Sequence, residues 1–339
     1  MKFIERKTKI IPSLYLPILR QAIEEQGYNF EQILDKAKIS ADSIDHSDSS
    51  LSYIHFKTVL KLIIKEVADE NFGLAVGKYL NINSHGDLGI AAMSSKNIHD
   101  AILLAIKYIK MQMPLLDLQF ILENDDAIIR ITTKHIKGTL KKFILDATIA
   151  SLHTIRAYFL NKKHITALLR LNYKEPKDLN SYHDLFGAKL YFNTPYAEYV
   201  FPKKELEVVF PLANQTIKRI AEEKCQQKLA ALEGHVDLLS VVKKYLLSTP
   251  GHFPQLPDIA SKLHLSDRTL KRYLNQLDAN YQEILNNTRC DLAIKYLLTT
   301  DLAIAEISQL LDYRDPSNFG TAFKKWTGQS PHNYRKLHG

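Results

Sequence analysis

The sequence contains few of the residues on which disulfide-rich, fibrous or membrane-spanning proteins depend. Its two cysteines, Cys225 and Cys290, show no paired spacing, which excludes a disulfide framework and favours a reducing compartment. Twelve glycines and twelve prolines among 339 residues are too few for a fibrous chain. No run of about 18 apolar residues is present, so we expect no membrane-spanning helix. The basic start of the chain, with Lys2 and Arg6, lacks the apolar stretch of a signal peptide.

The sequence also lacks the short motifs of common catalytic and metal sites. It has no His-Glu-x-x-His, Cys-x-x-Cys, phosphate loop or nucleophile elbow. His85 and Asp87 lie close together, but two residues do not make a metal site, and a loop or core role is favoured. We interpret Cys225 as an inert thiol in a Lys/Glu-rich helix and Cys290 as a packed one. The sequence therefore predicts no catalytic residues, no cofactor and no metal.

The overall composition is that of a folded protein with a mild excess of positive charge. Hydrophobic residues make up 45% and charged residues 24%, and at roughly 150 residues per domain the length predicts two or three domains. Forty-five Lys and Arg against 37 Asp and Glu give a net charge of +8. This charge favours an anionic partner such as nucleic acid or a membrane surface, but only weakly.

The first two thirds of the sequence mix helical and strand patterns. Apolar residues at helical spacing predict helices up to Met113, where Pro114 ends the pattern. Alternating apolar residues on either side of Asn124-Asp125-Asp126 predict a β-hairpin. Further elements follow as a helix over 143–159, strands over 168–172 and 189–192, and a helical segment over 179–186. Residues 1–213 are therefore predicted to form a mixed α+β domain.

The strand pattern disappears from about Asn214. Residues 214–235 are rich in Lys and Glu and predict a solvated connecting helix, with a break at Gly234. Residues 236–339 read as short helices separated by Pro, Gly and Asp, so we predict an all-α second domain. This segment has thirteen Lys and Arg against ten Asp and Glu, so the positive charge is not concentrated there.

The last hundred residues contain an internal repeat. Ile259, Leu263 and Leu265 recur 48 positions later as Ile307, Leu311 and Tyr313, and the apolar pair Leu270/Leu274 recurs as Phe319/Phe323. Each copy is a short helix, a tight turn and a second helix, and Ser266 and Asp315 are good N-caps for the two second helices. This spacing is typical of a helix-turn-helix, although a helical hairpin without function gives the same pattern.

The outward faces of the second helices favour the functional interpretation. At about 100° per residue, Arg268 and Arg272 lie opposite Leu270, where they suit guanine edges or phosphates; a merely solvated basic face is the alternative. In the second copy, the face opposite the phenylalanines is shorter and polar. It carries Ser317, Thr321 and Lys325, and Asn318 lies by the helix start.

The segment between the copies predicts a rigid spacer. Its apolar residues recur at helical spacing from Tyr281 to Leu298, which gives a helix of about 27 Å. Together with the widths of the two motifs, this length approaches one turn of DNA, about 34 Å. One chain would then read two successive major grooves.

Several segments resemble the transcription regulators of the AraC/XylS family. Residues 259–272, IASKLHLSDRTLKR, resemble the first DNA-binding motif of that family, and 289–301 its linker helix. The run DPSNFGTAFKKWTGQSP at 315–331, followed by Tyr334-Arg335, is similar to the family signature. His264 and Asp312 stand where the family usually has a turn glycine, so both turns are expected to need a left-handed residue.

The resemblance implies a cytoplasmic bacterial regulator that binds duplex promoter DNA. Matched to the family pattern, the DNA-contacting residues would be Arg268, Lys271, Arg272, Ser317, Asn318, Thr321, Lys324 and Lys325. The N-terminal part resembles the larger α+β sensor domain of one subgroup, with Ile11-Pro12, residues 85–89 and residues 184–188 as matching segments. Such a domain would bind a small-molecule effector and form a homodimer, and RNA polymerase is a further possible partner.

The sequence leaves alternatives open. The apolar helices over 98–113 and 143–159 would either wall a ligand pocket or belong to the core, and they favour a non-polar or weakly acidic effector. An enzyme domain fused to a DNA-binding module and an architectural DNA binder without a ligand are the rival functions.

Overall fold

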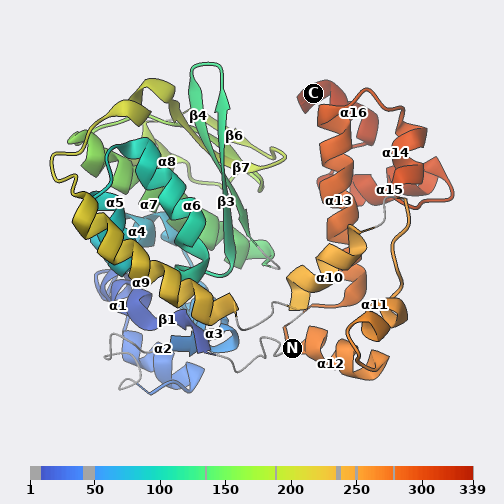
Figure 1. Ribbon diagram of the computed structural model, residues 1–339, viewed down its shortest axis with the longest axis horizontal. Helices are drawn as coiled ribbons and strands as arrows, with labels where there is room; N and C mark the ends of the chain where they lie inside the picture. The colour runs from blue at the N-terminus through green and yellow to red at the C-terminus, as the bar shows by residue number, and fades with distance from the viewer. Residues whose placement is uncertain are drawn as a thin grey trace. The chain divides into compact units, whose positions relative to one another are not determined.

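The computed structural model describes residues 9–40, 50–133, 136–187, 189–233, 238–248, 251–277 and 279–338 (Figure 1). The chain divides into two compact units, Lys7–Gly234 and His235–Gly339. The predicted break at Gly234 lies outside the described residues. Within the part that is described, no helix combines the length and the apolar character needed to cross a membrane.

The first unit begins with helices and a small two-stranded sheet. Strands β1 (Lys9–Pro12) and β2 (Ser50–Ser52) pair antiparallel. Asn29, Ser52 and Asn97 accept backbone hydrogen bonds at three of the helix starts, as N-cap residues do. The helices are α1 (Leu16–Glu24), α2 (Phe30–Ala37), α3 (Tyr53–Val67), α4 (Phe72–Tyr79), α5 (Gly86–Met93) and α6 (Ile98–Gln112), with 3-10 turns at Ser13–Tyr15 and Ile82–His85.

A five-stranded sheet forms the second half of this unit, in the order β3-β4-β7-β5-β6. The predicted hairpin is present as β3 (Leu116–Glu123) and β4 (Asp126–Thr133), and both predicted later strands are present as β5 (Leu168–Leu171) and β6 (Lys189–Phe192). Strands β5 and β6 run parallel, because α8 (Asn180–Phe186) provides the crossover between them. The predicted mixed α+β class of this unit is thus confirmed.

The central strand β7 (Ala197–Pro202) was not predicted from the sequence. All its residues from Ala197 to Phe201 are buried, so it shows no alternation of apolar and polar positions. The buried carboxylate of Glu198 lies between two arginines of the neighbouring strands, 2.7 Å from Arg130 Nη2 and 2.9 Å from Arg170 Nη1. A charged residue within a strand breaks the apolar pattern by which strands are predicted from sequence. In the fold, the two arginines balance the charge of Glu198.

Helix α7 (Gly138–Leu160) crosses the middle of the first unit and packs closely on α4. The approach depends on two glycines of α4. A Cβ atom at Gly73 would lie 2.5 Å from the carbonyl oxygen of Phe143, and one at Gly77 would lie 2.5 Å from that of Ala147. Any side chain at either position would therefore push the two helices apart.

Helix α9 (Gln215–Glu233) is not a fully solvated connector. Its residues Ala221 and Cys225 are buried against α5 and α6, and ion pairs flank them, with Lys107 Nζ 2.9 Å from Glu222 Oε1 and Lys228 Nζ 2.7 Å from an oxygen of Asp87. The predicted charged face is real, but the opposite face belongs to the core of the first unit. Burial raises the pKa of Cys225 to about 11, so its thiol stays protonated.

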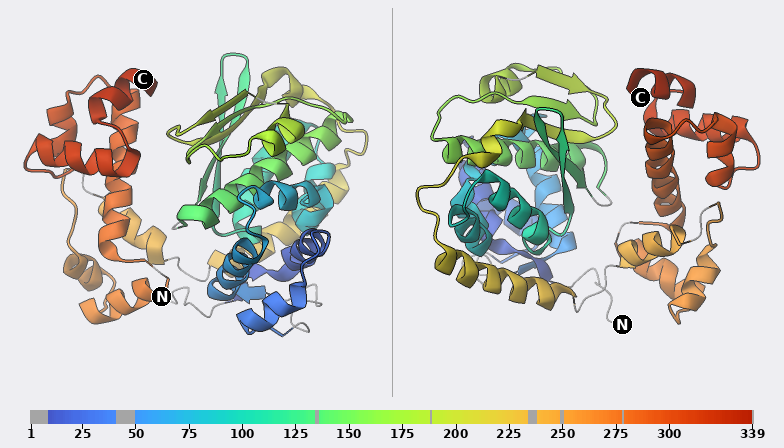
Figure 2. Two further views of the ribbon diagram at one scale, coloured as in Figure 1. Left: turned by 180° about the vertical axis from the view of Figure 1, so that it is seen from behind. Right: turned by 45° about the horizontal axis from the view of Figure 1, so that its top comes forward.

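The second unit is all-helical, as predicted. Its first half encloses one hydrophobic cluster that includes Leu238, Leu270, Leu274 and Ile284. Helices α10 to α12 lie near the start of the long helix α13, and α14 to α16 lie near its end (Figures 1 and 2). The bounds are α10 (Leu238–Leu246), α11 (Leu256–Lys262), α12 (Asp267–Gln276), α13 (Tyr281–Thr299), α14 (Ile304–Leu310), α15 (Pro316–Thr327) and α16 (Pro331–His338).

The contact between α4 and α7 can be tested by adding one methyl group. We expect Gly77→Ala to lower the free energy of unfolding by about 1–3 kcal/mol, because its Cβ overlaps the α7 backbone. Gly320→Ala in α15 is the control: nothing lies within 4 Å of that position, and the helix gains up to about 1 kcal/mol. Urea denaturation of the full chain measures both variants, and an equal effect at the two positions would contradict this packing.

Candidate DNA-binding surface and effector cavity

The two turns of the repeat have the same backbone geometry. His264 and Asp312 both adopt left-handed conformations, with φ of 55° and 60°. In each turn the following residue closes the same hydrogen bond: Leu265 N donates to Ala260 O at 2.9 Å, and Tyr313 N donates to Ser308 O at 3.0 Å. The turns therefore do require left-handed residues, and the repeat is one of structure as well as of sequence.

Helix α12 presents a basic face to solvent. Ser266 caps it by accepting the backbone N–H of Thr269 at 3.2 Å, and Leu270 and Leu274 are buried in the hydrophobic cluster. Arg268 and Arg272 are exposed on the opposite face, and Lys271 is exposed beside it. The predicted orientation of this helix, with leucines inward and arginines outward, is what the structure shows.

Helix α15 has a matching arrangement with a more polar face. Asp315 accepts the backbone N–H of Ser317 at 2.7 Å and Pro316 occupies the first turn, while Phe319 and Phe323 are buried. The exposed residues are Ser317, Asn318, Thr321, Lys324 and Lys325. The ion pairs found among the described residues of this unit are Lys243–Asp291 and Arg289–Asp312, so they leave the lysines and arginines of both outward faces available.

Helix α13 separates the two motifs with 19 residues, or about 28 Å at 1.5 Å per residue. Its C-terminal end is held by α16. Arg335 donates hydrogen bonds to the carbonyl oxygens of Leu297 at 3.2 Å and Leu302 at 2.6 Å, and Tyr334 packs edge-on against Phe323. The Tyr-Arg pair at the end of the sequence signature thus fixes the second motif onto the spacer.

Arg289 links both motifs to the middle of the spacer. Its guanidinium lies 5.0 Å from the ring centre of Phe253, in the first half of the unit, and 4.8 Å from that of Tyr313, in the second. Its Nη2 donates to the backbone oxygen of Asp312 at 3.3 Å, at the second left-handed turn. One planar cation therefore holds both halves at a fixed relative position.

The first unit contains an apolar cavity of about 170 Å³. Protein interiors rarely leave spaces larger than a water molecule, so a cavity of this size is unusual within a packed domain. Both helices that were predicted as possible pocket walls, α6 and α7, line it. The remaining walls come from α1, α3, α4, α5 and strands β3, β4 and β7.

A chain of hydrogen bonds runs along one wall of the cavity. Tyr15 Oη and His85 Nδ1 are 3.2 Å apart, His85 Nε2 and Ser151 Oγ are 3.4 Å apart, and Ser151 Oγ donates to the backbone oxygen of Leu80 at 2.6 Å. Because the Ser151 hydroxyl donates its proton to the Leu80 oxygen, it can only accept from His85. His85 therefore donates through Nε2–H to Ser151, and Tyr15 donates to His85 Nδ1. Burial lowers the pKa of His85 to about 4, so the ring is neutral at pH 7.

Among the described residues of the lining, Arg156 is the one charged side chain, and it is already paired. It donates to both carboxylate oxygens of Glu205, at 2.6 and 2.9 Å, to the backbone oxygen of Thr166 at 2.8 Å and to Tyr199 Oη at 2.9 Å. Four of its five N–H groups are thereby used. The charge serves to hold β7 and the turn Lys203–Glu207 against α7.

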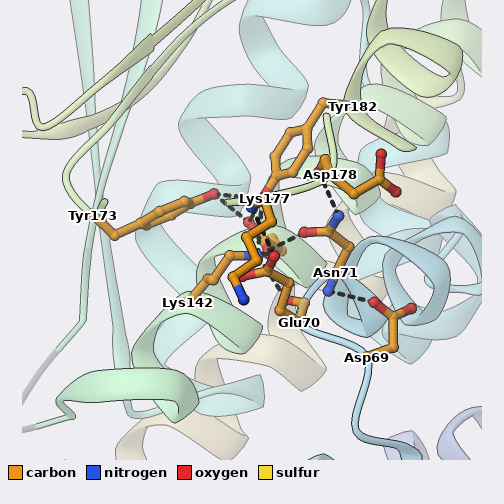
Figure 3. A network of polar contacts seen from close by, with 9 residues as sticks. Asp69, Glu70, Asn71, Lys142, Tyr173, Lys177, Asp178 and Tyr182 are labelled. Atoms are coloured by element: carbon orange, nitrogen blue, oxygen red, sulfur yellow. Dashed lines mark hydrogen bonds and ion pairs between the residues drawn. The ribbon is translucent and has the colours of Figure 1, made fainter. Parts of the chain in front are cut away.

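A polar network close to the cavity wall is a structural clamp. Lys142 Nζ donates to Asp146 at 2.7 Å, to Asn71 Oδ1 at 3.0 Å and to Tyr182 Oη at 3.1 Å, and Tyr173 donates to the same carboxylate (Figure 3). Burial raises the pKa of Asp146. Because these partners satisfy one another, the network joins α4, α7 and α8 and leaves no group directed at a ligand.

The other candidates from the sequence have structural roles. His85 belongs to the wall of the cavity, and Asp87 pairs with Lys228 of α9. Among the described residues, no group of three or more His, Cys, Asp or Glu is placed to hold a metal ion. Most cavity residues were not predicted individually, since they come from helices and strands far apart in the sequence that meet only in the fold.

Comparison with known proteins agrees with this architecture. Residues 27–208 match the profile described as the arabinose-binding domain of AraC transcription regulator, N-term, and residues 259–337 match a helix-turn-helix domain. The ornithine utilization regulator of Pseudomonas aeruginosa is 31% identical over 328 residues, 97% of each chain. The transcriptional activator NphR of a Rhodococcus species is 39% identical over 83 residues, which are 24% of this chain and 25% of NphR.

Among solved structures, the transcriptional regulator CdpR from Pseudomonas aeruginosa covers 91% of this chain and 98% of its own, at 20% identity and a TM-score of 0.44. The matched proteins are regulators of transcription, so the alternative of an enzyme fused to a DNA-binding module is not supported. With a full-length relative above 30% identity and a sensor-domain match over more than half its residues, the chain belongs to the AraC family of DNA-binding transcription regulators.

Proposed function

We propose that α12 and α15 read two successive major grooves of promoter DNA. The observation that supports this proposal best is the pair of exposed polar faces on two capped helices, held near opposite ends of a spacer of about 28 Å. Major grooves on one face of B-DNA recur every 34–36 Å. The spacer and the widths of the helices that pack on it are of the size that this repeat requires.

The two helices would divide the work of recognition. On α12, Arg268 and Arg272 would contact guanine edges, with Lys271 on a phosphate, because bidentate arginine is the commonest reader of guanine. On α15, Asn318 would read adenine and Thr321 a thymine methyl group, and Ser317 would add a further hydrogen bond. Lys324 and Lys325 would contact phosphates beyond the end of that face.

The cavity of the N-terminal unit would hold the effector. We assign residues 1–213 to effector binding and dimerisation, 214–235 to the connection and 236–339 to DNA binding, in a homodimer that acts in the bacterial cytoplasm. An effector that binds one arrangement of the two units better than another would shift promoter occupancy or contact with RNA polymerase. An apolar cavity of this size within a packed domain favours this function over that of an architectural DNA binder without a ligand.

The names of a relative and of the matched N-terminal profile suggest two candidate effectors. The relative from Pseudomonas aeruginosa is named for ornithine utilization, and the matched N-terminal profile is named for arabinose binding. L-ornithine and L-arabinose are therefore the first two compounds to examine.

The division between base and phosphate contacts can be tested with operators selected from random DNA by the full chain. We expect Arg268→Ala and Arg272→Ala each to cost about 1–3 kcal/mol of specific binding and to relax the preference at particular base pairs. Lys324→Ala should weaken binding to all sequences and reduce the slope of log K against log salt by about 1. Lys295→Ala, at an exposed position on α13, is the control and should bind as the unaltered chain does. Arginine variants with unchanged base preferences would contradict the assignment.

The role of Arg289 can be tested by changing the spacing between the two half-sites of that operator. We expect Arg289→Met to weaken binding to the natural spacing by about 1–2 kcal/mol, because both ring contacts and the hydrogen bond to Asp312 are lost. The same variant should tolerate one inserted base pair better than the unaltered chain. Lys295→Met is the matched control on the same helix. A uniform loss at every spacing would show that Arg289 only stabilises the fold.

A further inference from the structure

We propose that the cavity accepts an uncharged, largely apolar molecule, and neither a sugar nor a charged amino acid. This inference rests on the proposed effector-binding function of the N-terminal unit and specifies the chemical class of its ligand. A dry apolar cavity of about 150 Å³ is known to take up benzene, so the roughly 170 Å³ here suits a ligand of about six to eight non-hydrogen atoms.

The lining is almost entirely hydrocarbon. It is built from leucine, isoleucine, alanine, valine, methionine and phenylalanine side chains, and its polar side chains are Tyr15, His85, Thr148, Ser151, Arg156 and Tyr199. Each of these six already has a partner within the protein. Thr148 donates to Ile144 O at 2.7 Å and Tyr199 is bonded to both His153 and Arg156, while the bonds of the other four are described above.

A charged ligand would meet no counter-charge in this cavity. No aspartate or glutamate is found among the described residues that line it, so the ammonium groups of ornithine would be buried without an anion. A carboxylate could reach only Arg156, whose guanidinium is bound through two N–H groups to Glu205, so that two negative charges would compete for one cation. His85 is neutral at pH 7 and cannot replace that cation.

A sugar is disfavoured for a different reason. Each hydroxyl group of arabinose needs a partner when it leaves water, and an unpaired one costs about 1–3 kcal/mol on scales derived from proteins. Three hydroxyl groups of the lining already donate within the protein: Tyr15 to His85, Thr148 to Ile144 O and Ser151 to Leu80 O. The wall therefore offers apolar contact and no free hydroxyl proton from these three residues, so a sugar hydroxyl could only donate to one of their oxygen lone pairs.

The test uses thermal melting of the full chain with four probes, namely toluene, 1-hexanol, L-arabinose and L-ornithine. We expect toluene and 1-hexanol, each near ten times its dissociation constant, to raise the melting temperature of the N-terminal unit by about 3–6 °C. Arabinose and ornithine should produce no shift. Operator affinity is measured in the same samples.

Variants locate the binding. Ala105→Leu on α6 and Ala92→Leu on α5 each add a larger apolar side chain to the lining and should remove most of the toluene shift. A cooperative melting transition of each variant without probe shows that the variant is folded. If Ala105→Leu does not fold, Ala92→Leu provides the test. Leu103→Met, at an exposed position on the same helix as Ala105, is the matched control and should keep the full shift.

The outcomes separate the ligand class from the effector function. A shift with arabinose or ornithine and none with toluene or 1-hexanol would overturn the proposed class, yet leave effector binding intact. No shift with any probe, or a toluene shift that survives in both filled variants, would also overturn it. Binding of toluene in the cavity without any change in operator affinity would support the class and contradict the effector function.

Discussion

The fixed distance between two helix-turn-helix motifs is the constraint on which the DNA-binding unit depends. That distance is set by the unbroken helix α13 and by the contacts that hold a motif at each end. Arg289 holds the middle through two aromatic rings and the Asp312 carbonyl, and Arg335 holds the far end through the carbonyls of Leu297 and Leu302. Because these contacts involve backbone carbonyls and flat rings, a lysine could not replace either arginine without loss of geometry.

In the N-terminal unit, helix α7 packs tightly on α4 and also lines the apolar cavity. Gly73 and Gly77 bring α4 onto the α7 backbone, and the Lys142–Asp146 pair fastens the same helix to α8 through Tyr182. Ala147 and Ser151 of α7 nevertheless face an apolar cavity. A helix fixed this firmly can form one wall of a binding site without collapsing into it, and a ligand that binds there would stabilise the folded unit.

The sequence predicted the elements whose signals are local. The hairpin around Asn124-Asp125-Asp126 alternates visibly, and the repeat of Ile259 and Leu263 at 48 residues revealed both motifs, because helix faces and caps are encoded within a few positions. Strand β7 was missed because both its faces are buried and it contains the charged Glu198. The buried face of α9 was hidden by its charged residues.

The binding cavity could not be predicted for a more general reason. Its walls come from elements far apart in the sequence, and a lining alanine such as Ala105 looks like any core alanine. His85 was noticed only as a neighbour of Asp87, whereas its partners Tyr15 and Ser151 lie 70 and 66 residues away. The exposed faces of α12 and α15 were predictable because inward leucines and phenylalanines define them by exclusion.

Hydroxyl-radical footprinting of the full chain on its selected operator tests the central claim most directly. Two motifs held by α13 on one side of the duplex should give, for each protomer, two protected backbone segments about one helical turn, or 10–10.5 base pairs, apart on the same face. A single protected segment for each protomer, or two segments on opposite faces of the duplex, would contradict the account.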